Sequence, residues 1–187
     1  ASLHFERQDA IGILRLDRAA KRNALNDPTV EGMRDFFVAP PDGLRAVVLH
    51  GAGDHFCAGL DLSELNAMSA AEGVHHSRMW HEAFARIQFG TLPVVAVLHG
   101  AGGGGGLELA CSAPVRVAEP SAFYALPEAQ RGIFVGGGGS VRLPRIIGAH
   151  RMADMMLTGR VYSAEEGQAL GISTWAKPVT TASGPSR

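Results

Sequence analysis

The chain has 187 residues, of which 17 are Lys or Arg and 18 are Asp or Glu, so its formal net charge is -1. Because these charges are scattered, they exclude a basic stripe of the kind that binds nucleic acid or an anionic membrane. No window approaches the ~20 apolar residues that a membrane-spanning helix requires. We therefore expect one domain whose partner is a small molecule, with no nucleic acid and no membrane.

Three short apolar runs predict strands. Residues 11–16 alternate as a strand does, residues 45–50 form an apolar run that ends at Gly51, and residues 93–99 form a third run. Runs without polar interruption are typical of parallel strands that helices bury on both faces.

Helical patterns lie between and after these strands. Asp27 and Pro28 precede apolar residues at helical spacing, which predicts a helix with Asp27 as its N-cap and Pro28 as its first residue. Residues 62–87 also have helical spacing, with a break expected near Gly73. Pro114 is expected to end a further helix. The alternation of strands and helices predicts an α/β fold with right-handed crossovers.

Glycines are concentrated at a few places in the chain. Residues 100–105 satisfy the pattern G-x-G-x-x-G after a predicted strand, which in a first βα turn indicates a dinucleotide site. Here the pattern lies mid-chain in a run that is nearly all glycine, so it matches by accident and the nucleotide interpretation is weak. For residues 136–139 we expect close packing of a helix against a strand.

Histidines and cysteines give no metal signature. His75, His76 and His81 lack the i, i+4 spacing of a helical zinc site, and no Cys-x-x-Cys pair is present. We expect no metal, and we expect these histidines at the surface or at the rim of a pocket. His99 is expected to orient the glycine turn that follows it.

Cys57 and Cys111 lie far apart in apolar or glycine-rich segments, which favours a reducing compartment. No basic region followed by an apolar stretch opens the chain. The sequence therefore favours a cytoplasmic location.

Four further motifs share an order and a spacing. They are Phe56-Cys57-Ala58-Gly59-Leu60-Asp61, Gly104-Gly105-Gly106-Leu107-Glu108-Leu109-Ala110, Leu126-Pro127-Glu128, and the segment 136–144. Together they resemble the crotonase superfamily, the enoyl-CoA hydratase/isomerase family. The resemblance implies a crotonase (ClpP-like) fold, in which repeated ββα units form a superhelical core. It also implies that the C-terminal helical region is truncated, so we expect a core at 1–175 and a disordered tail at 176–187.

The resemblance further implies a site for an acyl-CoA thioester. The backbone N–H groups of Leu60 and Gly105 would hold the thioester oxygen, Glu108 would activate water, and Glu128 would exchange the proton at C2. Coenzyme A would be part of the substrate, so no cofactor is expected, and the implied assembly is a homotrimer or a dimer of trimers. The other positions that the resemblance implies for substrate binding are Lys21, Ala24, Cys57, Ala58, Gly59, Asp61 and Gly104.

Elementary chemistry is consistent with this site. Water addition to a 2-enoyl thioester needs a base for the water and an acid for C2. Two carboxyls in one apolar pocket repel, which raises the pKa of at least one of them. Taken singly, each of Glu108, Glu128 and Asp61 could instead cap a helix or turn, and for Asp61 that structural account is the simpler one.

Two other functions stay open at this point. In an enoyl-CoA isomerase, one glutamate would shuttle a proton between C2 and C4. In a non-catalytic CoA-binding module, the site would bind coenzyme A without turnover. The sequence does not determine the acyl chain length.

Overall fold

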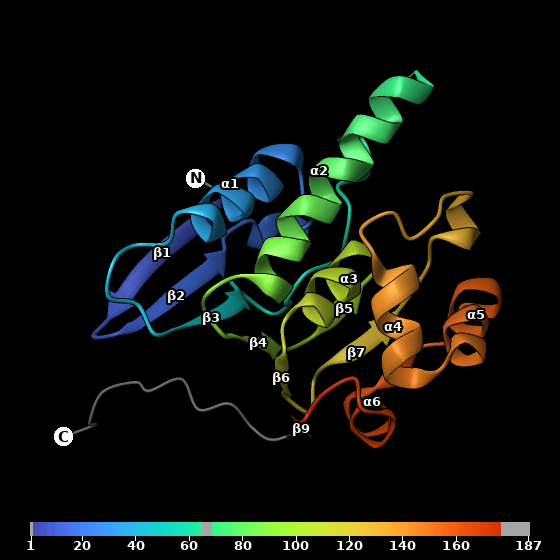
Figure 1. Cartoon of the computed structure of the whole chain (residues 1–187). Coiled ribbons are helices and arrows are strands. Elements are labelled where there is room, and N and C mark those ends of the chain that lie inside the picture. The colour runs from blue at the N-terminus through green and yellow to red at the C-terminus, as the bar shows by residue number, and fades with distance from the viewer. Residues whose placement is uncertain (1, 65–68, 177–187) are drawn as a thin grey trace.

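A computed structural model describes residues 2–64 and 69–176, which form two sheets covered by helices (Figure 1). The larger sheet has six strands in the order β1-β2-β3-β4-β6-β9, and the smaller has three in the order β5-β7-β8. The strands are β1 (Leu3–Gln8), β2 (Ile11–Leu16), β3 (Ala46–Gly51), β4 (Val94–Leu98), β5 (Ala101–Gly103), β6 (Val115–Ala118), β7 (Phe123–Ala125), β8 (Tyr162–Ser163) and β9 (Trp175–Ala176). The α-helices are α1 (Asp27–Val38), α2 (Ala70–Phe89), α3 (Gly105–Ser112), α4 (Gly139–Ile147), α5 (Ala149–Thr158) and α6 (Ala164–Leu170), and the short 3-10 helices are η1 (Ala19–Lys21), η2 (Leu62–Glu64) and η3 (Ala129–Arg131).

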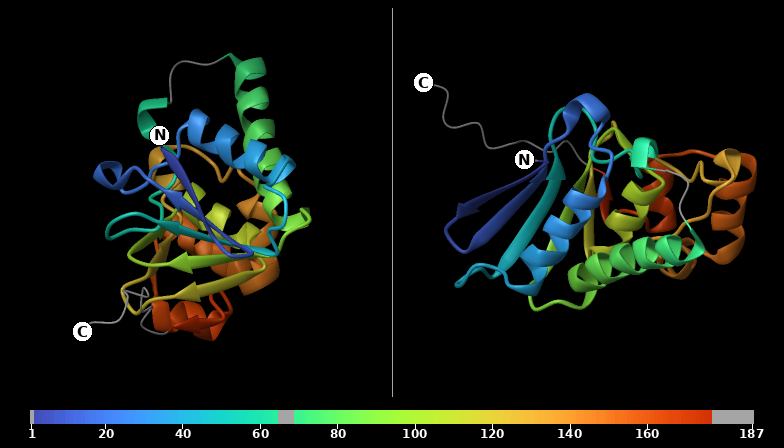
Figure 2. Two further views of the ribbon diagram at one scale, coloured as in Figure 1. Left: turned by 90° about the vertical axis from the view of Figure 1, so that its left-hand side faces the viewer. Right: turned by 90° about the horizontal axis from the view of Figure 1, so that it is seen from above.

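The larger sheet begins as an antiparallel hairpin and continues with parallel strands. β1 pairs antiparallel with β2, after which β2, β3, β4, β6 and β9 pair in parallel. β2, β3 and β4 agree with the predicted strands. Their burial differs in part from the prediction, because one face of β3 is fully buried, at Val47 and Leu49, while the other face is only half-buried. Helices α1 and α2 pack together beside this sheet (Figure 2).

A repeated order of strand, strand and helix builds the centre of the molecule. β4, β5 and α3 form one unit and β6, β7 and α4 form the next, and each element contacts its counterpart in the other unit. The chain before them follows the same order, because β3 pairs with β4, the bridge between Cys57 and Gly102 extends the smaller sheet, and α2 contacts α3. These stacked units confirm the predicted superhelical ββα core.

The predicted cap of α1 is wrong. The N-cap is Asn26, whose side chain accepts a hydrogen bond from Thr29 N at 3.3 Å. Asp27 is therefore the first helical residue and Pro28 the second. The amide oxygen of Asn26 caps as well as a carboxylate does, which shifts the start of the helix by one residue from the prediction.

The predicted break near Gly73 is also wrong. Helix α2 is capped by Ser69 in a capping box with Glu72, and it passes through Gly73 unbroken. Helix α3 does end just before Pro114, as predicted. Residues 65–68, within the predicted helical pattern, lie outside the described residues. So does the predicted tail, except that Ala176 belongs to β9.

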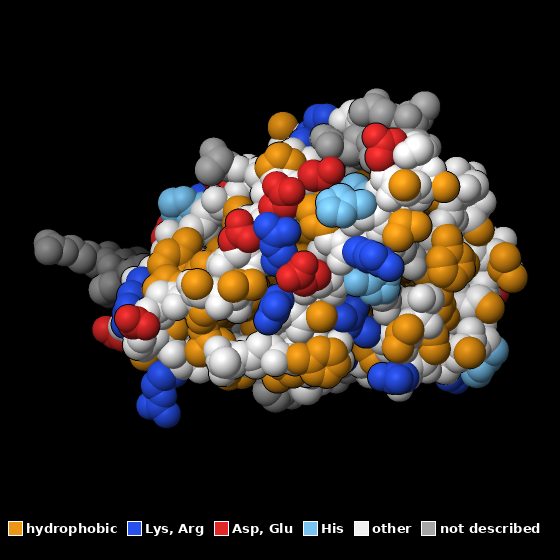
Figure 3. Space-filling model, turned by 45° about the horizontal axis from the view of Figure 1, so that its top comes forward, with side chains coloured by type: hydrophobic (Ala, Val, Ile, Leu, Met, Phe, Trp, Pro, Cys, Tyr) orange, Lys and Arg blue, Asp and Glu red, His pale blue; other side chains and the backbone are white. Residues whose placement is uncertain are grey.

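The surface over α1 and α2 carries charges of both signs. Figure 3 shows acidic and basic side chains intermingled on this face rather than separated into patches. On this face the side chains therefore form no basic stripe, in agreement with the scatter of charges along the sequence. No helix in the described part of the chain is long and apolar enough to cross a membrane.

Candidate active site

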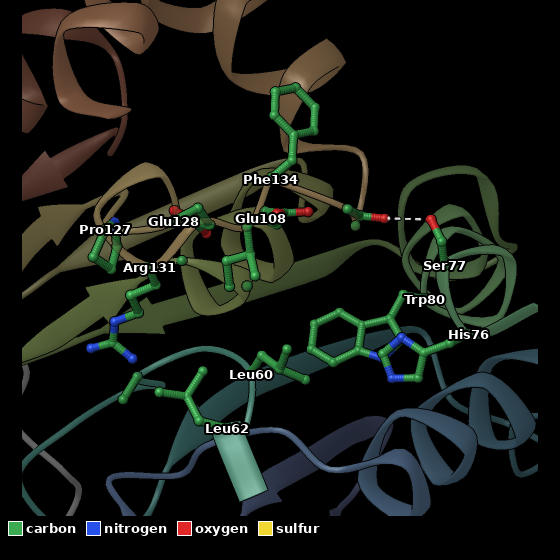
Figure 4. A pocket seen from close by; sticks show the side chains of 16 residues that line it. Leu60, Leu62, His76, Ser77, Trp80, Glu108, Pro127, Glu128, Arg131 and Phe134 are labelled. Atoms are coloured by element: carbon green, nitrogen blue, oxygen red, sulfur yellow. Dashed lines mark hydrogen bonds between the residues drawn. The ribbon is translucent and has the colours of Figure 1, made fainter. Parts of the chain in front are cut away.

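A pocket of about 180 Å³ opens between the stacked units (Figure 4). Its lining comes from the segment 58–62, from α2, from the start of α3 and from the segment 127–137. In Figure 4, Glu108 and Glu128 lie beside each other on one side of the pocket, and Trp80 lies on the other side. Most of the lining is apolar, so the two carboxyls lie in surroundings that disfavour charge.

Two turns approach each other closely at this pocket. Cys57 N donates to Ala101 O at 3.0 Å, and Gly103 N donates to Cys57 O at 3.2 Å. A Cβ on Gly59, where φ is +99°, would lie 2.8 Å from Gly103 O. Only glycine permits this backbone conformation and this approach without strain. Much of the glycine run at 100–105 therefore serves the packing of one turn against the other.

This approach leaves two backbone N–H groups free at the pocket. Among the described residues, no backbone acceptor or side chain pairs with the N–H of Leu60 or of Gly105, and both residues line the pocket. Gly105 is the first residue of α3, where helix geometry leaves the N–H unpaired and the helix dipole adds positive charge. The other turn is fixed by Leu25, whose N–H donates to Gly59 O at 2.7 Å. Both groups can thus donate to a ligand in the pocket.

Glu108 lies in the first turn of α3, and its side chain is 3% exposed. Burial, with a smaller contribution from the neighbouring Glu128 carboxyl, raises the pKa of Glu108 to about 7. The backbone N–H of Gly139 opposes this rise by donating to Glu108 Oε2 at 3.3 Å. Glu108 can therefore exist in either protonation state near neutral pH, which suits a group that exchanges a proton.

Glu128 precedes η3, and it is 5% exposed. Its side chain makes no capping hydrogen bond to any described residue, so the structural alternative, a carboxylate that caps a turn, does not apply to it. Burial raises the pKa of Glu128, against the opposing effect of the Arg131 guanidinium. Within the described part of the chain, Glu128 Oε2 is buried without a hydrogen-bond partner. A buried oxygen without a partner is costly and is expected to be paired when a ligand or water is bound.

Asp61 has the structural role that its sequence position indicated. Its carboxylate accepts hydrogen bonds from Ser63 Oγ at 2.7 Å, from Arg18 Nη2 at 2.7 Å and from Lys21 Nζ at 3.3 Å. These bonds hold the pKa of Asp61 well below its usual range. Asp61 pairs with Arg18 and with Lys21 beside the turn that carries Leu60, and neither Asp61 nor Lys21 lines the pocket.

The pocket brings together some of the predicted site residues and not others. Those that line it are Ala58, Leu60, Gly104, Gly105, Glu108 and Glu128. Those outside it are Lys21, Ala24, Cys57, Gly59 and Asp61. Cys57 and Gly59 support the lining from behind through the backbone contacts between the two turns.

Residues 136–139 were interpreted too narrowly from the sequence. They do not pack a helix on a strand but lie against a carboxyl, since a Cβ on Gly139 would lie 2.6 Å from Glu108 Cγ. The sequence also missed the contribution of α2, whose Ser77 and Trp80 line the pocket. The four consecutive glycines were the only sequence signal for their contact with Glu108. Because Glu108 is distant from them in sequence, the contact leaves no local pattern.

The histidine predictions are borne out in part. His76 lines the pocket, and its Nε2 lies 2.9 Å from Asp27 Oδ1. His99 does not orient the turn that follows it, because its Nε2 lies 3.2 Å from Gly51 O in an earlier turn. In the described ranges, no group of three or more His, Cys, Asp or Glu residues is arranged to hold a metal ion.

Residues 6–182 match the family model described as enoyl-CoA hydratase/isomerase. The chain belongs to this family. Its fold matches the crystal structure of a candidate enoyl-CoA hydratase from Rhodopseudomonas palustris with a TM-score of 0.93 and 57% sequence identity, over 95% of this chain and 69% of that one.

Two curated relatives in the enoyl-CoA hydratase/isomerase family set the scale of the match. The short-chain-enoyl-CoA hydratase of Clostridium acetobutylicum is 32% identical over 172 residues, which are 90% of this chain and 66% of that protein. The fatty acid oxidation complex subunit alpha of Shewanella loihica is 42% identical over 134 residues, which are 70% of this chain and 19% of that protein. The chain thus spans about two thirds of the first relative and about a fifth of the second.

Proposed function

We propose that this chain binds a 2-enoyl-CoA thioester and adds water across its C2–C3 double bond. The observation that carries the proposal is the pocket itself, in which two buried carboxyls and two free backbone N–H groups line one largely apolar space. Relatives named short-chain-enoyl-CoA hydratase and crotonyl-CoA hydratase support the same reaction.

In this mechanism, the N–H groups of Leu60 and Gly105 donate to the thioester oxygen. As water adds, negative charge grows on that oxygen, and donors already in place stabilise it without reorganisation. The loss of one such donor costs ~3–4 kcal/mol of transition-state stabilisation. The dipole of α3 adds to the effect at Gly105.

The two glutamates divide the proton transfers. Glu108, as the carboxylate, accepts a proton from water while the water oxygen bonds to C3. The electron pair of the double bond moves toward the thioester oxygen, and protonated Glu128 then gives a proton to C2. The raised pKa of each carboxyl supports the presence of one protonated acid near neutral pH, which the transfer to C2 requires. The assignment of the base to Glu108 and of the acid to Glu128 follows the family resemblance. The product gains OH at C3 and H at C2.

The test follows the loss of enoyl-thioester absorbance with crotonyl-CoA. We expect turnover by the intact chain and at least ~100-fold lower kcat for Glu108→Gln and for Glu128→Gln, since acid–base groups contribute roughly 100- to 10,000-fold. Glu165→Gln, an exposed change on α6, is the matched control and should retain full activity.

Other outcomes point to the alternative functions. Turnover of a 3-enoyl-CoA that depends on one glutamate alone would replace the hydratase with an isomerase. Coenzyme A binding by a folded, inactive chain would favour a non-catalytic module. The cytoplasmic location, the homotrimer or dimer of trimers, and the absence of a cofactor stay predictions.

A further inference from the structure

The backbone turn at residues 136–139 lies directly behind the Glu108 carboxyl. Gly139 N donates to Glu108 Oε2 at 3.3 Å. A Cβ on Gly137 would contact the same oxygen, and a Cβ on Gly139 would lie 2.6 Å from Glu108 Cγ. The Glu108 carboxyl therefore packs directly against the backbone of these glycines. The direction of their N–H groups determines the position of the carboxyl and the support of its charge.

Two side chains outside this contact hold the carbonyl groups of the turn. Ser77 Oγ on α2 donates to Gly136 O at 3.1 Å, as the dashed line in Figure 4 marks. Arg142 Nη1 on α4 donates to Gly137 O at 3.0 Å, and Arg142 Nε donates to Gln88 Oε1 at 2.6 Å. The turn is thus tied to α2 at two points.

Peptide planarity transmits this restraint to the amides. The Gly136 carbonyl and the Gly137 N–H belong to one rigid peptide unit and point in opposite directions. Fixing Gly136 O from α2 therefore directs the Gly137 N–H toward Glu108, where that amide favours the carboxylate. Arg142 fixes the next peptide unit, which lies between the two amides that support Glu108, those of Gly137 and Gly139.

We propose that Ser77 and Arg142 are positioning residues for Glu108, acting through the turn at residues 136–139. The inference rests on the proposed function, in which Glu108 activates water. Neither hydroxyl nor guanidinium has to touch the reacting atoms for this role, because each acts on a carbonyl on the far side of a peptide plane.

Several charged or titratable groups surround Glu108 and bear on any pH dependence. Glu128 raises the pKa of Glu108, whereas the Arg142 guanidinium lowers it. Cys111 lies on the same helix, and its thiol is affected by the Glu108 charge. His81 on α2 also faces the turn, with its Nδ1 3.4 Å from the position of a Cβ on Gly138. Every variant in the test keeps Glu128, Cys111 and His81 unchanged.

The first measurement is the pH dependence of kcat and KM with crotonyl-CoA. We expect Ser77→Ala and Arg142→Met to lower kcat roughly 10- to 100-fold, since a catalytic group displaced by about 1 Å can cost ~100-fold. KM should change less than about twofold, because binding is not the step affected. The acid limb of kcat/KM should move to higher pH in both variants, since each weakens the support of the Glu108 carboxylate.

Conservative and control variants separate positioning from general damage. Ser77→Thr keeps the hydroxyl and should recover most of the activity lost in Ser77→Ala. Arg145→Met removes a positive charge from an exposed position on the same helix and should behave as the unmodified chain. Unchanged pH profiles in Ser77→Ala and Arg142→Met, with losses only in thermal stability, would overturn the proposal.

A titration without substrate distinguishes this proposal from the proposed function. The δ-carboxyl signal of Glu108 is followed by carbon NMR in protein labelled at glutamate, and Glu108→Gln assigns it. We expect the pKa of Glu108 to rise in Ser77→Ala and in Arg142→Met but not in Arg145→Met. Because loss of the Arg142 charge itself also raises this pKa, the uncharged change Ser77→Ala decides the action through the turn. If the intact chain hydrates no enoyl-CoA, the proposed function fails while this titration still decides the positioning role. The same pKa of Glu108 in all variants would refute the positioning role.

Discussion

Glu108 is held between burial, which favours its neutral form, and backbone amides, which favour its carboxylate. Burial is the stronger influence, so the pKa of Glu108 rises from 4.5 to about 7. Between these values the folded chain binds more protons at this group than the unfolded chain does. By linkage, this group's contribution to stability decreases as pH rises through that window. A carboxyl that suits proton exchange thus lowers the stability of the fold at neutral pH.

Replacement of Glu108 by Gln should therefore stabilise the protein in a pH-dependent way. A rise from 4.5 to about 7 corresponds to roughly 3 kcal/mol, which is the upper limit of the gain in the free energy of unfolding at pH 8. Below pH 4 the gain should vanish, because the carboxyl is then protonated in both states. Urea unfolding at several pH values measures this, with Glu165→Gln as the control. A gain that is the same at pH 4 and pH 8 would contradict the buried, raised carboxyl.

At the level of elements, α2 links the N-terminal half of the chain to the pocket. It packs against α1 on one side and contacts α3 on another, and its side chains reach both the pocket and the turn at residues 136–139. Gly73 lies in its first turns, where a Cβ would meet no atom of the described residues within 4 Å. No packing requirement explains a glycine at that position.

Gly73→Ala should consequently stabilise the protein, by ~0.5–1 kcal/mol, because alanine loses less backbone entropy in a helix. Gly132 is the matched control, since a Cβ there also meets nothing within 4 Å in the part of the chain that the structure describes, but φ is +67°. Gly132→Ala should destabilise by about 1 kcal/mol, because the left-handed conformation is strained for alanine. Thermal unfolding of both variants measures the two changes in stability. Destabilisation by Gly73→Ala would show that a glycine is needed in α2 after all.

The sequence predicted those elements whose signal is local. The strands β2, β3 and β4 and the helix α1 follow from hydrophobic spacing, and the end of α3 follows from Pro114. The start of α2 was harder to predict, because Gly73 in its first turns resembles a helix breaker. The capping box of Ser69 and Glu72 stabilises the start of the helix despite this glycine.

The sequence predicted less of the site wherever contacts are distant along the chain. Family motifs identified Glu108, Glu128, Leu60 and Gly105, which all line one pocket. The support that Glu108 receives from residues 136–139 joins segments about thirty residues apart and carries no periodic signal. Close backbone approaches of this kind become visible only when the stacked units are seen together.

On the scale of the whole molecule, the stacking of ββα units places some strands at the centre of the larger sheet and leaves others exposed at its edge. β4 lies between β3 and β6 in the larger sheet and leads directly into β5 and α3. The free N–H of Gly105 is therefore carried by the most enclosed unit of the core. β1, at the edge of the same sheet, is almost entirely exposed. Backbone donors placed in this way remain fixed even when the edge of the sheet opens.

The rates of amide hydrogen exchange should increase from the centre of the larger sheet to its edge. Amides of β4 should exchange roughly 100-fold or more slowly than those of β1, because edge strands open in local fluctuations whereas central strands exchange through larger unfolding. β2 should be intermediate, since it pairs with both β1 and β3. Mass spectrometry of peptides that cover the three strands measures these rates. If β1 exchanged as slowly as β4, another surface would have to cover the exposed side of β1, and dilution of the protein should then restore fast exchange.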